Sequence, residues 1–167
     1  MKVLVILSVS MFSFFQIPAQ VQSSAYNLTL KALLSHSVPE VYVSQLAGMS
    51  HVILLDAREW NEYEVSHIKN AIYVGYDQFD VRNLPSIEKK KKIIVYCSVG
   101  YRSEKISEKL VQAGYADVSN LYGGIFEWVN EGYPVVDKKE NVTENIHAYS
   151  KAWGVWLNKG VKVYTSN

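Results

Sequence analysis

Short apolar runs alternate with amphipathic segments along most of this chain. Three continuous apolar runs predict buried strands, at 52–56, 71–74 and 93–96, and residues 118–121 predict another strand. Between and after them lie segments with apolar residues at helical spacing, at 59–64, 103–113 and 124–131. Strands that alternate with helices at this spacing predict an α/β fold with a mainly parallel sheet. Ligand sites in such sheets lie at the carboxyl ends of the strands, where Asp56 and Cys97 stand.

Further segments flank this pattern at both ends. Residues 26–37 predict an N-terminal arm, a short amphipathic helix whose apolar face holds Leu28, Leu30, Leu33 and Leu34. Residues 41–43 then predict a brief strand, and Ser44 a helix cap. In the C-terminal extension, 138–167, one predicted helix face carries aromatic and aliphatic residues and ends before an edge strand at 161–164. These face residues are Ile146, Tyr149, Trp153, Trp156 and Leu157.

The aromatic face of the extension has two interpretations. We expect it to pack on the domain, as such stripes usually do. The alternative is a surface for a protein acceptor or for a second copy of the chain.

The first residues have the pattern of a secretory signal peptide. A positive start precedes an apolar run at 3–15, and small residues follow. We therefore expect residues 1–25 to hold a leader cleaved after Ala19 or Ala25, and the protein to be exported to a periplasm or secreted. The run is shorter than the roughly 20 residues that a membrane span needs, so we expect no span after cleavage.

Composition narrows the classes of function. The hydrophobic content of 49% favours a packed globular core, and a net charge of +1 gives no indication of a nucleic-acid partner. The single cysteine excludes an intrachain disulfide and any cysteine-based zinc site. The four histidines are scattered, without the spacing of metal ligands.

The lone Cys97 lies between the strand at 93–96 and the following helix. Ser103 can cap this helix, with Glu104 in its first turn and Gly114 as its stop. A loop that enters a helix N-terminus aims backbone N–H groups at one point, which favours thiolate over thiol. The alternative is a buried structural cysteine. The flanking Gly100 and Arg102 favour the reactive thiolate.

Four motifs in register resemble the rhodanese family over roughly 38–137. They are Leu55-Asp56-Ala57-Arg58-Glu59, Glu62-Tyr63 with Ser66-His67-Ile68, Cys97-Ser98-Val99-Gly100-Tyr101-Arg102-Ser103, and Tyr122-Gly123-Gly124-Ile125 with Trp128. The resemblance implies a three-layer domain with a five-stranded, mainly parallel sheet. Two positions depart from the family, which usually has glycine where this chain has Ser66 and Asn70.

The resemblance implies sulfur transfer without a cofactor or metal. Cys97 would take a sulfane sulfur from a small anionic donor such as thiosulfate and hold it as a persulfide. A thiol or cyanide acceptor would then remove it. Arg102 would bind the donor, because its guanidinium matches oxyanions. The N–H groups of the loop would cradle the persulfide, from Ser98, Val99, Gly100, Tyr101, Arg102 and Ser103.

The remaining polar residues have more modest predicted roles. Asp56 and Arg58 are expected to pair and brace the loop, with His67 as a structural neighbour; an acid–base set is the alternative. Tyr101 either shapes the pocket entrance or packs. A phosphatase with a Cys-x5-Arg loop is disfavoured, since Cys97 and Arg102 enclose only four residues. A persulfide carrier or a binding module remains the alternative to an enzyme.

Overall fold

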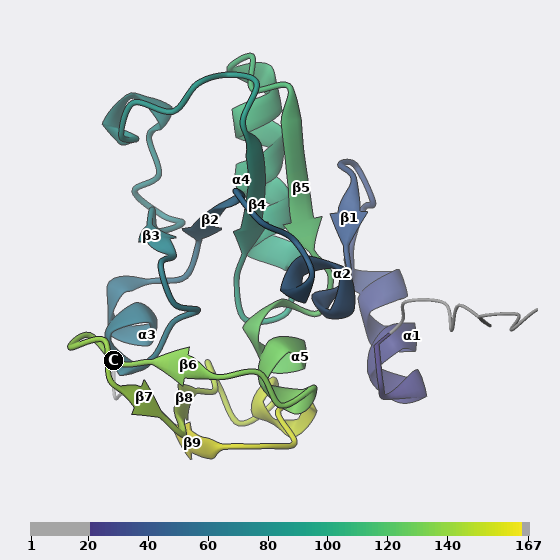
Figure 1. The fold of residues 1–167 in the computed structure, drawn as a ribbon. Helices are drawn as coiled ribbons and strands as arrows, with labels where there is room; N and C mark the ends of the chain where they lie inside the picture. Colours follow the sequence, from purple (N-terminus) through teal and green to yellow (C-terminus); the bar gives the residue numbers. More distant parts are fainter. Residues whose placement is uncertain (1–20, 165–167) are drawn as a thin grey trace, which may run out of the picture.

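A five-stranded parallel sheet forms the centre of the computed structural model, which describes residues 21–164 (Figure 1). The strand order is β1-β5-β4-β2-β3, with β4 in the middle. The strands are β1 (Glu40–Val41), β2 (Ile53–Asp56), β3 (Ile72–Tyr73), β4 (Lys92–Tyr96) and β5 (Asp117–Leu121). The predicted α/β class and the mainly parallel sheet are confirmed.

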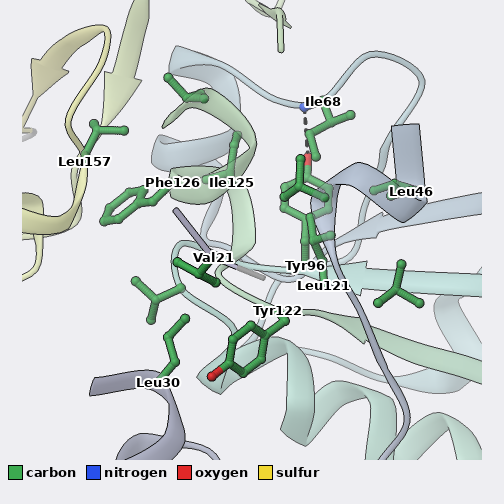
Figure 2. Close-up of a cluster of buried hydrophobic side chains, with 14 of the residues drawn as sticks. Val21, Leu30, Leu46, Ile68, Tyr96, Leu121, Tyr122, Ile125, Phe126 and Leu157 are labelled. Atoms are coloured by element: carbon green, nitrogen blue, oxygen red, sulfur yellow. Dashed lines mark hydrogen bonds between the residues drawn. The ribbon is translucent and has the colours of Figure 1, made fainter. Parts of the chain in front are cut away.

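Side chains alternate between two cores on opposite faces of the sheet. Ile93 and Val95 of β4 point to one face, where α4 (Tyr101–Gln112) covers them with Ile106 and Leu110. Ile94 and Tyr96 point to the other face. That face is covered by α1 (Ser24–Leu33), α2 (Val43–Ala47) and α5 (Gly124–Asn130). The result is the predicted three-layer arrangement, and Figure 2 shows the second core.

The N-terminal arm is an integral part of this second core. Tyr26 and Leu30 of α1 are fully buried, and the Tyr26 hydroxyl donates to the Gly123 carbonyl at 3.0 Å. Leu28 is 70% exposed, so its predicted place on the buried face is wrong. The helical period places Leu28 on the outer side of a helix whose buried positions are Tyr26 and Leu30.

The predicted helix in the C-terminal extension is also wrong. Its place is taken by β8 (Asn145–His147), a 3₁₀ turn (Gly154–Trp156) and β9 (Val161–Val163), which pairs in parallel with β8. Tyr149 has a positive φ of 61°, which a helix does not accommodate. The aromatic stripe therefore divides: Ile146 and Leu157 are buried in the core, while Trp156 stacks on Tyr26 with ring centroids 5.3 Å apart.

Smaller elements complete the chain. A second small sheet pairs β6 (Val135–Val136) with β7 (Val142–Thr143), and α3 (Trp60–Val65) follows β2. The predicted strand at 41–43 is shorter, because α2 begins at Val43 with Tyr42, rather than Ser44, as its cap. The leader predicted at 1–25 lies mostly outside the described residues. Within 21–164, no helix is both long and apolar enough to cross a bilayer.

The two departures from the family pattern are both accommodated. Asn70 adopts a φ of 66°, the left-handed conformation that Asn tolerates better than most residues. Ser66 has a φ of −168° and a ψ of 153°, so its backbone is extended and needs no glycine. Its buried hydroxyl has no hydrogen-bond partner among the described residues.

A pair of leucines tests how far α1 belongs to the core. Leu30→Ala should destabilise the fold by about 2–5 kcal/mol, because it empties a fully buried site. Leu28→Ala, two residues earlier in the same helix, should change stability by less than about 0.5 kcal/mol. Urea unfolding measures both, and equal effects would show that α1 is not packed as described.

Candidate active site

Cys97 follows β4 directly and lies at the floor of a loop. The side chain is 1% exposed, and its Sγ accepts a hydrogen bond from the Gly100 backbone N–H at 3.1 Å. Gly100 has a φ of 121°, a conformation that side-chain-bearing residues rarely adopt. One of the predicted N–H donors of the loop therefore reaches the sulfur, through a turn that requires glycine.

The helix after the loop starts three residues earlier than predicted. Gly100 is the N-cap of α4, and Ser103 lies inside its first turn rather than capping it. Ser103 is fully buried, and its hydroxyl donates to Asn120 Oδ1 at 2.7 Å. The Asn120 amide in turn donates to the Gly100 carbonyl at 3.0 Å. Polar side chains from α4 and β5 thus fix the turn that carries the donor to sulfur.

The N-terminus of α5 holds the other side of the loop. The N–H groups of Ile125 and Phe126 donate to the carbonyls of Cys97 and Ser98, at 2.9 and 3.1 Å. Gly124 lies so close that an added Cβ would stand 2.4 Å from the Cys97 carbonyl oxygen. The second glycine of the fourth family motif is therefore required by backbone contact with the cysteine loop.

Glu62 of α3 joins the helix to the cysteine loop. Its carboxylate accepts hydrogen bonds from both terminal nitrogens of Arg102, at 2.6 and 2.8 Å, and from the Ser98 hydroxyl at 3.0 Å. The Glu59 N–H donates to the same carboxylate at 3.0 Å. The Arg102 fork is thus occupied by a buried partner from the same chain. Its predicted role in donor binding stays a prediction.

The charges around Glu62 shift its ionisation. Burial raises the pKa of Glu62, but the hydrogen bonds and charge of Arg102 outweigh burial and lower this pKa to about 2. His147 of β8 lies near, with Nδ1 3.9 Å from Glu62 Oε1. Burial lowers the pKa of His147, so the neutral ring is favoured, and its Nδ1 accepts from the Tyr149 N–H. At neutral pH the site holds one ion pair beside a neutral imidazole.

Asp56, Arg58 and His67 each have structural partners. Asp56 and Arg58 make a fully buried ion pair at 2.6 Å, and Arg58 also donates to the Ser66 carbonyl at 2.6 Å. His67 stacks on Tyr63 and lies 3.2 Å from the Glu140 carboxylate. The Ala57 N–H, between the two, donates to the carbonyl before Cys97. The bracing role of the pair and the acid–base alternative both stay predictions.

A pocket of about 210 Å³ opens above Cys97. Leu33 of α1 forms one wall, and Tyr149 and Trp153 of the C-terminal extension form another. Tyr101 is 42% exposed and lines the same pocket. Segments from outside the predicted domain thus contribute directly to the surroundings of the cysteine.

A second, larger pocket of about 620 Å³ shares Tyr101, Arg102 and Tyr149 with the first. Its lining is polar and includes Glu59 and Asp77. Within the described residues, no group of three or more His, Cys, Asp or Glu side chains is placed to hold a metal ion. The chemistry that the described residues offer at Cys97 is that of a thiol beside a neutralised ion pair.

Several residues of the site were not predicted as such. Glu62 belongs to a motif that resembles the family, and its pairing with Arg102 follows only from the tertiary contact. Asn120 lies in the predicted strand at 118–121, and nothing in the sequence marks it as a residue that contacts the cysteine loop. Tyr149 and Trp153 belong to the aromatic face predicted for the C-terminal extension. The predicted helix gave no indication that they line the pocket of Cys97.

Substitution of Gly124 should disrupt the cysteine loop. Gly124→Ala places a Cβ against two backbone carbonyls at a φ of 57°, so we expect a loss of about 3 kcal/mol or more. Gly48→Ala is the matched control, because the nearest atom to its Cβ would be 3.6 Å away. Thermal unfolding compares the two, and a Gly124→Ala protein as stable as the control would contradict the described contact.

Acid titration should reveal the pair of Glu62 and Arg102. The folded pKa of Glu62 is below its ordinary value of 4.5, so the stability that the carboxylate contributes is complete above pH 4.5 and is lost as the pH falls toward 2. Glu62 should account for about 2 kcal/mol of loss between pH 5 and pH 3. Glu62→Gln should be less stable near neutral pH yet lose correspondingly less over that interval. Parallel pH profiles in chemical denaturation would refute the assignment.

Comparison with known proteins agrees with this geometry. The family model described as rhodanese-like domain matches residues 39–131, more than half of the chain. The tRNA uridine(34) hydroxylase of Hamiltonella defensa is 38% identical over 93 residues, which cover 52% of this chain and 26% of that protein. Its Bacillus cereus counterpart is 41% identical over 78 residues, 44% of this chain and 24% of that protein. The chain thus spans about a quarter of the length of these relatives.

Solved structures show the same fold. A rhodanese-related protein from Thermoplasma volcanium has a TM-score of 0.52 and 32% identity, covering 59% of this chain and 97% of the other. A rhodanese-like domain protein from Staphylococcus aureus has a TM-score of 0.53 and 28% identity, covering 60% and 98%. The family model, the motif order and the fold agree, and the chain belongs to the rhodanese family.

Proposed function

We propose that the protein is a sulfurtransferase that carries sulfane sulfur as a persulfide on Cys97. The observation that carries this proposal is the position of Cys97 Sγ, at the floor of a pocket and 3.1 Å from the Gly100 N–H. A thiolate there is stabilised by that donor and by the N-terminal end of a twelve-residue helix. It is also accessible to a small molecule through the pocket.

The reaction proceeds in two displacements at sulfur. The Cys97 thiolate attacks the sulfane sulfur of the donor, forming an S–S bond while the donor's own bond to that sulfur breaks. The leaving group departs with the electron pair, as sulfite if the donor is thiosulfate. An acceptor thiolate or cyanide then attacks the outer sulfur and releases the Cys97 thiolate. Neither step requires a general base, a metal or an external oxidant.

The surrounding groups suit this chemistry better than phosphate transfer. A phosphate-binding loop needs free N–H groups and a free cation around three oxygens. Here Cys97 and Arg102 enclose four residues, and the Arg102 fork is bound to Glu62. The tRNA uridine(34) hydroxylases are matched over only about a quarter of their own length, so the activity in their name is not part of this proposal.

We also propose that the protein is exported, with processing after Ala19 rather than Ala25. Val21 is buried, the Gln22 N–H donates to Glu127 at 2.7 Å, and Ser23 caps α1. Cleavage after Ala25 would remove all three contacts. A single cysteine kept outside the cytoplasm is consistent with a thiol that has a chemical role.

Intact mass spectrometry tests the proposal. After incubation with thiosulfate or inorganic polysulfide, the protein should gain the mass of one sulfur, and Cys97→Ser should gain none. Subsequent addition of cyanide or a small thiol should restore the original mass. Repeated turnover would identify an enzyme, whereas a single stoichiometric loading that is released only to a protein would identify a carrier. Failure to load with every donor tried would refute the proposal.

A further inference from the structure

Part of the wall of the Cys97 pocket comes from outside the family domain. The family model ends at residue 131 and starts at residue 39, whereas Leu33 precedes it and Tyr149 and Trp153 follow it. These three side chains, with Val99 of the loop, give the pocket an apolar lining. The segments on either side of the family domain therefore contribute to what can approach the sulfur.

The charge that lines this pocket is already compensated. Arg102 is bound by both oxygens of Glu62, and it also donates to the Ser98 hydroxyl at 3.0 Å. Its side chain is 12% exposed, and its guanidinium carbon lies 5.0 Å from the centroid of the Tyr149 ring. A small anion that took both terminal nitrogens of Arg102 would have to displace Glu62. The cost of leaving that carboxylate buried without a partner opposes this exchange.

Tyr149 is held over Arg102 at a backbone cost. Its φ of 61° is unusual for a bulky residue and costs about 1–2 kcal/mol. The surrounding hydrogen bonds enforce the conformation: the Ala148 N–H donates to Val163 at 2.9 Å, and the Tyr149 N–H donates to the His147 ring at 3.3 Å. The ring is thus placed by the fold of β8 and β9 rather than by its own preference.

The volume of the pocket suits an organic group of limited size. About 210 Å³ exceeds the roughly 150 Å³ of an apolar protein cavity that binds benzene. Such a group would lie between Leu33 and Trp153 with its sulfur toward Cys97. We propose that the acceptor in sulfur transfer is a low-molecular-weight thiol that carries an aromatic or branched aliphatic group. This inference rests on the proposed function and specifies its substrate class.

The transfer step is balanced for such an acceptor. The thiolate of the acceptor attacks the outer sulfur of the Cys97 persulfide, a new S–S bond forms, and the bond between Sγ and that sulfur breaks. The products are an organic persulfide and the Cys97 thiolate. The apolar walls bind the organic group and exclude water from the reacting sulfur atoms, which raises the rate for apolar acceptors over small polar ones.

Single-turnover transfer from loaded protein tests this inference. Protein that has been loaded with inorganic polysulfide is mixed with benzyl mercaptan or with 2-mercaptoethanol, two alkyl thiols of similar acidity, and loss of the added sulfur is followed by mass. Benzyl mercaptan should react on the order of 10-fold faster or more at equal, subsaturating concentration. In Trp153→Ala and in Leu33→Ala, the ratio of the benzyl mercaptan rate to the 2-mercaptoethanol rate should fall severalfold. It should approach the ratio that the two thiols show with a small persulfide in solution.

Trp60→Ala is the matched control, because Trp60 is 51% exposed and lines neither of the two pockets around Arg102. It should leave the ratio unchanged. Two variants from separate walls keep the test decisive if one of them fails to fold. Loading of Cys97 without any preference for benzyl mercaptan, or a preference that survives in both wall variants, would overturn this inference alone. Absence of loading would overturn the proposed function itself.

Discussion

The buried carboxylate of Glu62 is the interaction on which the site depends. It gathers Arg102, Ser98 and the Glu59 N–H, and so connects α3 to the loop between β4 and α4. Removal of one partner would leave a charge in the interior, which is far more costly than loss of a surface ion pair. The pair therefore fixes the loop geometry and at the same time neutralises the cation beside Cys97.

Two further constraints complete the loop. Backbone N–H groups at the start of α5 bind the carbonyls of Cys97 and Ser98, which is feasible only because Gly124 has no side chain. On the opposite side, Asn120 and Ser103 hold Gly100 so that its N–H reaches the sulfur. The cysteine is thus positioned by contacts from α3, which precedes it in the chain, and from β5 and α5, which follow it.

The parts of the fold that sequence predicted are those governed by local pattern. The runs that became β2 and β4 are continuous and apolar, and α4 ends just before Gly114, the predicted stop. The helix predicted in the C-terminal extension was wrong, because aromatic residues at helical spacing do not reveal the positive φ of Tyr149 or the pairing of β8 with β9. Ser103 is not the N-cap of α4, because the helix begins three residues earlier, after Gly100 with its φ of 121°.

The sequence was enough to predict which residues form the site, but not which of them contact each other. Cys97 and Arg102 stand out by spacing, but the engagement of Arg102 with Glu62 is a contact across 40 positions. A crystal structure of the protein after treatment with a sulfane donor tests the account most directly. It should show one added sulfur on Cys97, directed between Leu33 and Trp153, with Arg102 still bound to Glu62. An unmodified Cys97, or an Arg102 that no longer binds Glu62, would contradict it.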